Sequence, residues 1–265
     1  MRDLLWADSV SFRYAPERPL VVDGVSVRIP PGGLVGILGP NGSGKTTLLR
    51  LLSGTRTATG GRVVLDGESM EELSRRAVAR RIAVVPQETE LAFEYRALEI
   101  VLMGRHPHLG VFQVEGAADV AIAREALSAT GTSELADRHF HTLSGGEKQR
   151  VIIASALAQA SDILLLDEPT ASLDLGYQLE IASLLQRLNR ERGVALAIST
   201  HDLTLAAALC RDLVLLREGR VIAAGPTESV LTPANIERLY DVEADVHVHA
   251  QTGRVAVVPL RRITR

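Results

Sequence analysis

The sequence predicts an α/β fold with a parallel sheet, because short apolar runs alternate with stretches of helical periodicity. Residues 34–38 and 163–166 are nearly continuous apolar runs, which is typical of strands buried on both faces. Residues 194–198 form a third such run, and residues 147–160 and 175–188 carry helix-length apolar patterns. Buried strands that are separated by helices predict a parallel sheet with helices on its faces.

The N-terminal part carries a different pattern, that of an added antiparallel sheet. Val25, Val27 and Ile29 alternate with polar residues, and the segment ends in a Pro-Pro-Gly-Gly turn. Residues 10–14, which include Phe12 and Tyr14, repeat this period of two. Farther along, residues 213–216 and 221–224 flank a Glu-Gly-Arg turn and predict a hairpin.

Two segments stand apart from this core. Residues 90–140 lack strand signals and carry a helical pattern around 119–129, so we expect a helical insertion. In the tail, Thr232-Pro233 is typical of a helix start, and a hairpin is expected around residues 251–254. We therefore expect one domain over 1–265, made of a β-subdomain plus core (1–89 and 160–226), a helical subdomain (90–159) and a C-terminal helix and β-hairpin (227–265).

Composition excludes several classes of protein. The 265 residues are 46% hydrophobic and 23% charged, as in ordinary globular proteins, and the net charge of -3 argues against a nucleic-acid partner. The single cysteine, Cys210, cannot form an internal disulfide, which favours a reducing compartment. No apolar stretch has the length of a membrane span, so we expect a cytosolic chain that reaches any membrane through partners.

A glycine-rich run follows the first buried strand and precedes a helix. The run is Gly39-Pro40-Asn41-Gly42-Ser43-Gly44-Lys45-Thr46, followed by Thr47. It matches the P-loop pattern, in which glycines let backbone N–H groups turn toward a polyphosphate and the helix start faces the anion. Lys45 would supply a compact charge for the outer phosphates, and the Thr46 hydroxyl can ligate Mg²⁺. Since the only other lysine among many arginines is Lys148, the lysine here favours a ligand over a simple turn.

Two acidic residues follow the apolar run 163–166. At the end of a strand beside the P-loop, Asp167 can hold Mg²⁺ through its water shell. Glu168, one residue on, can orient or deprotonate an attacking water. A strand end that caps a neighbouring helix is the alternative for this pair, and the P-loop favours the functional interpretation.

A second helix start carries glycines. Ser144 can cap the helix that begins after it, and Gly145 and Gly146 expose N–H groups at its positive end, next to Glu147. Alone, this pattern is usually a capped helix. Together with the P-loop, it suggests that two helix starts bind one nucleotide.

In order and spacing these motifs resemble those of the nucleotide-binding subunits of ABC transporters, over nearly the whole chain. The motifs are Tyr14, the P-loop, Gln87, the Leu-Ser-Gly-Gly-Glu signature at 143–147, the run 163–168, Ser172-Leu173-Asp174 and His201. The resemblance implies an ATPase with a P-loop NTPase (RecA-like) parallel-sheet core, an N-terminal antiparallel β-subdomain and an inserted helical subdomain. It also implies a head-to-tail homodimer with ATP and Mg²⁺ between the P-loop of one copy and the signature of the other.

The resemblance further implies a role for each motif residue. Tyr14 would stack on adenine, Gln87 would sense Mg²⁺ and the γ-phosphate, and Glu168 would be the general base. His201 would contact the γ-phosphate, and Asp174 would line the dimer seam. Each residue also has a structural interpretation: a core aromatic for Tyr14, a loop start for Gln87, and a strand-end hydrogen-bonding group for His201.

Three further features resemble the importers of iron-siderophore complexes, haem and cobalamin. They are the runs 103–108 (Met-Gly-Arg-His-Pro-His), 174–180 and 239–242, the last before a hairpin that ends Val257-Val258-Pro259. Tyr177 departs from the pattern, in which His is common, so the chelate stays open. The resemblance implies that the chain lies at the cytoplasmic face of the inner membrane, with permease subunits as direct partners and a substrate-binding protein as an indirect one. It also implies that residues 90–140, with the Gln87 loop, form a groove for a cytoplasmic helix of the permease. The alternatives are a non-transport ABC ATPase, such as an iron–sulfur cluster assembly factor, and a catalytically silent binding module, against which intact Lys45, Asp167, Glu168 and His201 argue.

Three His-x-His pairs raise the question of a metal site. They are His106/His108, His139/His141 and His247/His249. No cysteine or third ligand accompanies them at a structural-zinc spacing, so we expect polar loops for the first two pairs and a solvent-exposed hairpin face for the third.

Overall fold

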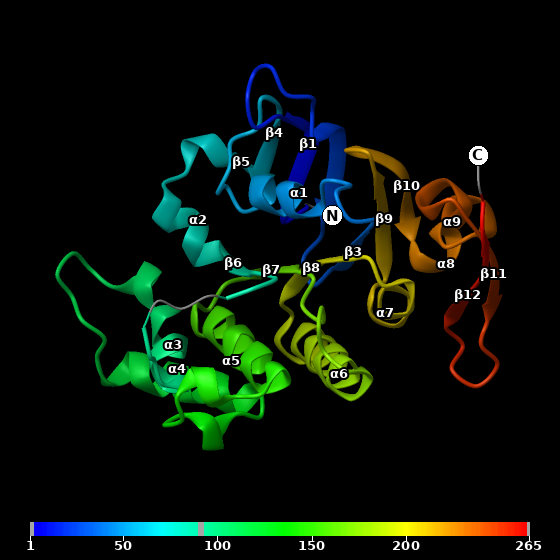
Figure 1. Ribbon diagram of the computed structural model, residues 1–265. Coiled ribbons are helices and arrows are strands. Elements are labelled where there is room, and N and C mark those ends of the chain that lie inside the picture. Colours follow the sequence, from blue (N-terminus) through cyan, green and yellow to red (C-terminus); the bar gives the residue numbers. More distant parts are fainter. Residues whose placement is uncertain (1–2, 90–92, 264–265) are drawn as a thin grey trace. The chain divides into compact units, whose positions relative to one another are not determined.

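The structure, a computed structural model, describes residues 3–89 and 93–263. Residues 90–92, where the expected helical subdomain begins, lie outside the described residues, as do both ends of the chain. The packing divides the chain into two compact units, Met1–Leu73 with Ala195–Arg265, and Ser74–Val194 (Figure 1). The finer division expected from the sequence stays a prediction, and each unit is described by itself.

The first unit holds most of the strands. They are β1 (Leu5–Phe12), β2 (Val22–Ile29), β3 (Leu34–Leu38), β4 (Gly60–Leu65), β5 (Glu68–Ser69), β8 (Ala195–Thr200), β9 (Asp212–Arg217), β10 (Arg220–Pro226), β11 (Val242–Val248) and β12 (Val255–Arg262). Its helices are α1 (Lys45–Leu52), α7 (Leu203–Leu209), α8 (Thr227–Val230) and α9 (Pro233–Tyr240), with a 3₁₀ turn η1 (Met70–Glu72).

An antiparallel sheet with the order β2-β1-β4-β5 forms the N-terminal part of this unit. Leu5 pairs with Ile29 and Val10 with Val25, which places the alternating apolar residues on one buried face. The predicted antiparallel sheet is therefore confirmed. Tyr14, which we expected on a strand, lies beyond the end of β1, because the chain bends there toward Arg18, whose amide donates to Ala15 O at 3.0 Å.

Four further strands of the first unit follow the order β10-β9-β3-β8, in which β9, β3 and β8 are parallel and β10 is antiparallel to β9. β3 pairs in parallel with both β8 and β9, and all its residues are buried, as the continuous apolar run predicts. β9 and β10 form the predicted hairpin. The register that sets Leu38 beside Thr200 brings the end of β3 and the end of β8 to the same edge. The parallel α/β core is confirmed.

The tail forms the expected helix and hairpin. The Thr232 hydroxyl caps α9 by accepting a hydrogen bond from the Asn235 amide at 3.2 Å, and Pro233 occupies the first turn. β11 and β12 pair antiparallel, with Val246 opposite Val257. The helix α9 and the hairpin β11–β12 are thus the last elements of the first unit.

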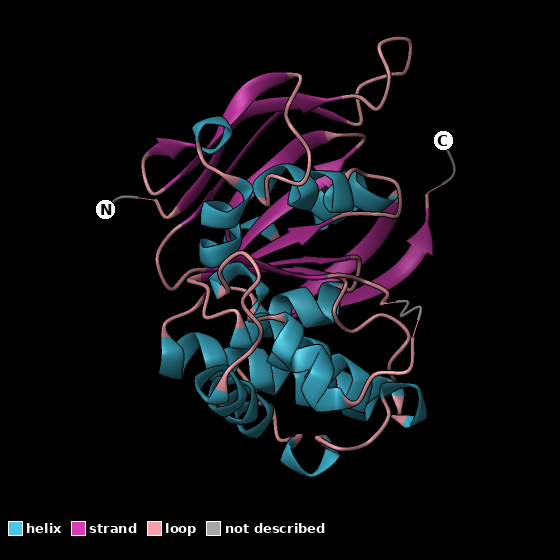
Figure 2. Cartoon of the chain, turned by 90° about the vertical axis from the view of Figure 1, so that its left-hand side faces the viewer, coloured by secondary structure: helices cyan, strands magenta, loops and turns pink. Residues whose placement is uncertain are grey.

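The second unit is mainly helical, and its helices pack together in Figure 2. Its elements are α2 (Arg75–Arg81), β6 (Ile82–Val85), α3 (Ala97–Met103), η2 (His106–His108), α4 (Ala117–Ala129), η3 (Ser133–Leu135), η4 (Phe140–Thr142), α5 (Gly145–Ala158), β7 (Ile163–Asp167) and α6 (Leu175–Arg192). Strands β6 and β7 pair in parallel. Helices α3, α4 and α5 share one apolar cluster that includes Ile100, Leu127, Phe140 and Val151.

The 103–108 run locks these helices together. A Cβ at Gly104 would lie 2.1 Å from the Ser155 carbonyl oxygen, so α3 and α5 approach closely only with glycine there. Buried Arg105 forms an ion pair with Asp119 at 3.0 Å and donates to Ala158 O at 2.7 Å. Hydrogen bonds from the Gly116 amide and from Arg105 hold the pKa of Asp119 below its ordinary value. This part of the motif is structural.

Within residues 3–89 and 93–263, the structure contains no helix with both the length and the apolar character that a bilayer crossing requires.

We predict that Cys210 is unreactive in the folded chain. Burial, with a smaller contribution from the charge of Asp212, raises the pKa of its thiol from 9.0 to about 12, and the thiolate is the reactive form. A chromogenic disulfide reagent at pH 8 should label almost no thiol in the native protein and one per chain in guanidinium. Since the folded pKa is raised, the contribution of this group to stability is full below pH 9 and is lost between pH 9 and about 12. Stoichiometric labelling of folded protein would contradict this assignment.

Candidate functional site

The loop of residues 39–46 joins β3 to α1, and its backbone path requires glycine. A Cβ at Gly39 would lie 2.2 Å from the Leu216 carbonyl oxygen and 2.6 Å from the Ser43 hydroxyl. Gly44 has a φ of 104°, in the left-handed region, and a Cβ there would lie 2.6 Å from Val21 O. A Cβ built at Gly42 would meet no described atom within 4 Å, so this side of the loop is open. Gly39 and Gly44 therefore allow the loop to pack closely against neighbouring backbone, and Gly42 leaves one side of the loop open to a ligand.

The polar groups of the loop fit an anion. Ser43 is 3% exposed, and among the described residues its buried Oγ has no hydrogen-bond partner. The Lys45 ammonium stays at the loop by donating to Gly39 O at 2.9 Å and Pro40 O at 3.1 Å. Thr46 is half-buried and Thr47 buried in the first turn of α1. A buried hydroxyl without a partner and an ammonium beside glycine amides at a helix start are the groups that a phosphate binds.

Tyr14 lies beside this helix. Its hydroxyl is 3.0 Å from the Thr47 hydroxyl, and Arg50 donates to it at 3.3 Å. The ring is half exposed, meets Phe12 edge-on at 5.0 Å, and has the Arg56 guanidinium 6.0 Å from its centre. Arg50 at the hydroxyl and Arg56 at the ring face, neither of which belongs to a sequence motif, thus flank the side chain that the resemblance assigns to adenine.

His201 follows the end of β8 and is exposed. The Gly39 amide donates to Thr200 O at 3.3 Å, which sets the start of the P-loop beside the residue before His201. The Tyr240 hydroxyl donates to the His201 carbonyl oxygen at 3.0 Å. The tail therefore supports the strand end that carries His201.

The tail also borders the P-loop itself. A cavity of about 250 Å³ lies between residues 40–43 of the loop and residues 217–218 and 239–241. Arg217 forms an ion pair with Asp241 at 2.7 Å, and this hydrogen bond raises the pKa of the guanidinium. The run 239–242 resembles that of chelate importers in the sequence, but only the fold shows that it borders the loop of residues 40–43.

In the second unit, the structure brings Gln87 and the acidic pair to one edge. Val85 pairs with Leu166 in parallel strands, so the residues that follow β6 and end β7 lie at the same carboxyl end. Asp167 is 7% exposed, whereas Gln87 is exposed. Glu168 has a φ of 47°, a conformation that L residues rarely adopt. Such strain is concentrated at functional sites, which agrees with a catalytic position.

The signature residues form a reciprocal cap at the start of α5. The Ser144 hydroxyl accepts from the Glu147 amide at 3.4 Å, and the Glu147 carboxylate accepts from the Ser144 amide at 2.8 Å. The hydrogen bonds from Ser144 are the main reason that the pKa of Glu147 is lowered, and Arg138 and Arg150 contribute less. Glu147 thus has a structural task in this chain, whatever it contacts in a complex.

Tyr177 packs against the same helix start. A Cβ at Gly146 would lie 2.3 Å from the Tyr177 ring, whereas at Gly145 the nearest side-chain atom would be 3.3 Å away, on Leu173. Asp174 caps α6 by accepting from the Tyr177 amide at 3.0 Å. The signature glycines and Asp174 are therefore joined through Tyr177.

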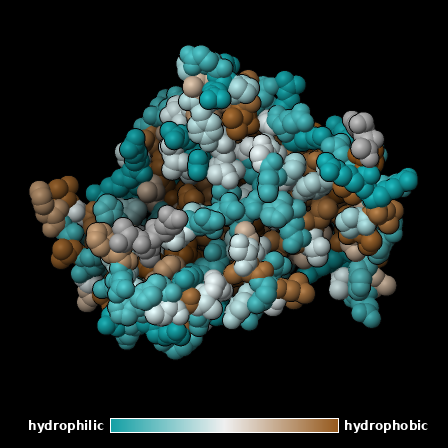
Figure 3. Space-filling model, in the orientation of Figure 1, coloured by the Kyte–Doolittle hydropathy of each residue, from teal (hydrophilic) through white to brown (hydrophobic). Residues whose placement is uncertain are grey.

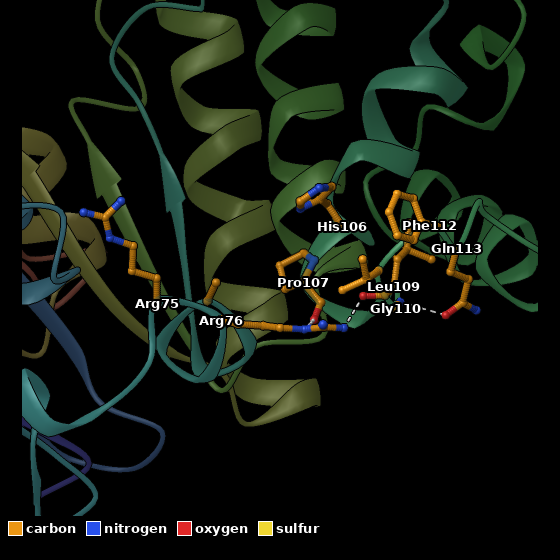
Figure 4. Close-up of a pocket in the computed structure, with 10 residues that line it drawn as sticks. Arg75, Arg76, His106, Pro107, Leu109, Gly110, Phe112 and Gln113 are labelled. Carbon is orange, nitrogen blue, oxygen red and sulfur yellow. Dashed lines mark hydrogen bonds between the residues drawn. The ribbon is translucent and has the colours of Figure 1, made fainter.

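Several cavities open on the surface of the second unit. A cavity of about 560 Å³ lies between α2 and the segment 106–113 (Figure 4). Arg76 donates to the carbonyl oxygens of Pro107 and Leu109 there, which ties this segment to α2. A smaller cavity, about 310 Å³, is lined by Thr89, Phe93, Glu94, Tyr95, Phe140, His141 and Lys148.

The comparison with known families decides the identity. Residues 22–171 match the family model described as ABC transporter. The chain belongs to the ABC transporter family. Within this family it is an ATP-binding cassette, a class of domains that are ATPases. The predicted α/β cassette fold is confirmed by solved cassette structures as well as by the strands above.

Two curated relatives show the degree of similarity. The cobalamin import ATP-binding protein BtuD of Halobacterium salinarum is 44% identical over 240 residues, which cover 91% of this chain and 60% of that protein. The chain therefore spans less than two thirds of that relative's length. The ferric enterobactin transport ATP-binding protein FepC of Escherichia coli is 41% identical, over 91% of this chain and 89% of its own.

Solved structures agree with these relatives. An ABC transporter assigned to the metal-chelate type, in an inward-facing conformation, aligns with a TM-score of 0.86 and 30% identity over 98% of both chains. The dimeric cassette MJ0796 aligns with a TM-score of 0.74 and 29% identity, over 84% of this chain and 98% of that one.

We predict that Gly146→Ala destabilises the fold by about 1–3 kcal/mol, because the added methyl group overlaps the Tyr177 ring. Gly145→Ala is the matched control: it makes the same change one residue earlier in the helix and meets only the flexible end of Leu173. Urea denaturation measures both. In a Tyr177→Ala background, Gly146→Ala should lower the free energy of unfolding much less than it does in the wild type, because the ring is gone. An equal cost of Gly146→Ala in both backgrounds would show that the ring is not the obstacle.

Proposed function

We propose that this chain is the ATP-hydrolysing subunit of an ABC importer, which couples ATP binding and hydrolysis in a head-to-tail homodimer to the uptake of a metal chelate. The observation that carries the proposal is the loop of residues 39–46. Its close-packed glycines, the buried Ser43 hydroxyl without a described partner and the Lys45 ammonium together fit a triphosphate. The family of the chain supports ATP as the ligand.

Each residue has a proposed task in this reaction. The backbone amides of the loop after Pro40, which itself has no N–H, and the Lys45 ammonium bind the phosphates, and Tyr14 stacks on adenine. Thr46, Gln87 and Asp167 would hold Mg²⁺, which when bound neutralises phosphate charge. Glu168 accepts a proton from the attacking water, and His201 contacts the γ-phosphate. In the partner copy, Ser144, Gly145 and Gly146 present the start of α5 to the same phosphates, and Asp174 lines the seam.

The substrate class follows from the relatives. Those reported above are named for cobalamin and for ferric enterobactin, and the metal-chelate type transporter covers nearly all of the chain. We propose an iron-siderophore complex as the cargo first, and haem or cobalamin next. The cargo would pass through permease subunits after delivery by a substrate-binding protein, while this chain acts at the cytoplasmic face of the inner membrane.

The second unit offers a surface for the permease. Phe93, Met103, Val111, Phe112 and Val114 are all exposed, and Phe112 is fully so. At the left edge of Figure 3, apolar side chains gather where Figure 1 draws the loop after η2. Hydrogen bonds from Arg76 and Arg80 to Pro107 O hold the base of this loop. An apolar surface on a tied loop favours a protein partner, and a cytoplasmic permease helix fits the proposed importer.

We expect Glu168→Gln to lower ATP turnover by about 10²–10⁴-fold, because an amide cannot accept the proton of the attacking water. Phosphate release measures the rate, and calorimetry measures nucleotide affinity, which should stay near that of the wild type. Size-exclusion chromatography with ATP and Mg²⁺ should then show a dimer that persists.

Lys45→Ala provides the complementary control for this experiment. It removes the ammonium at the loop, so nucleotide binding itself should fall, with hydrolysis lost as a consequence. Undiminished turnover in Glu168→Gln would overturn the base assignment, and unchanged affinity in Lys45→Ala would overturn the cradle assignment.

We predict that Phe93→Ser/Phe112→Ser abolishes co-purification with the permease but leaves basal ATP turnover within about twofold. Both rings are exposed, at 73% and 102%, so their loss should cost the isolated chain little stability. Leu179→Ser, on α6, is the control, since this side chain is exposed to a similar degree (59%) outside the proposed surface. Retention of the permease by the double variant, or its loss with Leu179→Ser, would contradict the assignment.

A further inference from the structure

One His-x-His pair acquires a third potential metal ligand in the fold. Glu94, His139 and His141 each offer a ligand atom, and these atoms lie within 4.8 Å of one another. The sequence offered no third ligand for His139/His141, so the expectation of a mere polar loop is incomplete. The other pairs have different surroundings: His108 contacts Gln159 O at 2.8 Å, and His247 lies 3.3 Å from Asp245.

Backbone pairing creates this cluster. Arg96 and His139 form an isolated antiparallel bridge, and the hydrogen bonds Ala97 N to Arg138 O (3.0 Å) and Phe140 N to Tyr95 O (2.9 Å) flank it. One step beyond Tyr95 and Phe140 stand Glu94 and His141. His139 ends the extended stretch and His141 lies in the 3₁₀ turn η4 that follows it, and this turn brings the two rings to 5.6 Å from each other. The hydrogen bonds of the Thr142 amide and hydroxyl to His139 O fix the turn.

A second observation points to a ligand. The Nδ1 atom of His139 is buried, and nothing in the described part of the chain forms a hydrogen bond with it. A buried ring nitrogen without a partner is costly, and a cation ligated by Nδ1 itself would remove that cost. The His139 and His141 rings stand 5.6 Å apart at 41°, tilted rather than stacked.

We propose that Glu94, His139 and His141 bind a divalent transition-metal ion. Two imidazoles and a carboxylate suit Zn²⁺ and similar ions, and three protein ligands leave one position for water. Glu94 and His141 are exposed and line the cavity of about 310 Å³, so an ion has a path to the site. Lys148 lines the same cavity and repels a cation, which predicts a moderate affinity rather than that of a structural zinc site.

The bound ion would have a mechanical effect. Glu94 precedes α3, and His139 and His141 precede the Ser144 cap, so the ion would fasten the segment after Gln87 to the segment before the signature. This inference stands on the cluster alone and does not require the proposed transport function.

The test is calorimetric titration of the tag-free full chain with ZnCl₂, without nucleotide. We expect saturable binding of one Zn²⁺ per chain, and His139→Ala/His141→Ala should weaken it by about tenfold or more. His106→Ala/His108→Ala is the matched control and should bind as the wild type does. Substituting Co²⁺ should give the visible absorption of a low-symmetry nitrogen–oxygen site, lost in the same variant.

Glu94→Gln is a second test variant, in case His139→Ala/His141→Ala fails to fold. Glu94 is exposed, so its substitution should leave the apolar cluster of α3, α4 and α5 intact. It should also weaken Zn²⁺ binding. The proposal would be overturned if the wild type did not bind Zn²⁺. It would also be overturned if His139→Ala/His141→Ala and Glu94→Gln both bound Zn²⁺ with the affinity of the wild type. Because neither readout uses ATP or the permease, failure here leaves the proposed function intact, and the reverse also holds.

Discussion

The close approach of the β3–α1 turn to the neighbouring strand β9 is the constraint on which the candidate site depends. The Leu216 carbonyl oxygen occupies the space that a side chain at position 39 would need, and Val21 O does the same at position 44. Glycine alone satisfies both, so the chain can turn from a buried strand directly into a helix whose first amides surround one point. The tight turn also buries Lys45. It buries the Ser43 hydroxyl as well, and the described part of the chain supplies no hydrogen-bond partner for that hydroxyl.

Several motif residues hold the scaffold as well as belong to the proposed site. Glu147 caps α5 through Ser144, Asp174 caps α6, and Arg105 is buried against Asp119. A helix start that presents amides to a phosphate must be rigid, and a reciprocal cap provides that rigidity. The departure at Tyr177 fits the same logic, because its ring fills the space over Gly146 that a smaller side chain would leave partly open.

The parts of the fold that could be predicted are those written in local periodicity. Continuous apolar runs marked β3, β7 and β8, and residues of the proposed site follow the carboxyl end of each of these strands. Strand β6 was not predicted, because its short run, residues 82–85, becomes a strand only through pairing with β7. Likewise Tyr14 continues the alternation of β1 in sequence, yet the chain turns before it. Arg50 and Arg56 carried no local signal, and the run 239–242 gave no sign that Tyr240 donates to the His201 carbonyl oxygen.

The His139/His141 pair shows where sequence reasoning of this kind must fail. Spacing within a segment reveals which residues share a face, but a three-ligand set needs a residue from a segment that pairs across the fold. Here that residue is separated from the histidines by α3 and α4, and the link is a single backbone bridge between Arg96 and His139. No periodicity encodes such a bridge. It arises because α3, α4 and α5 close around one apolar cluster, which includes Phe140, and so draw the two loops together.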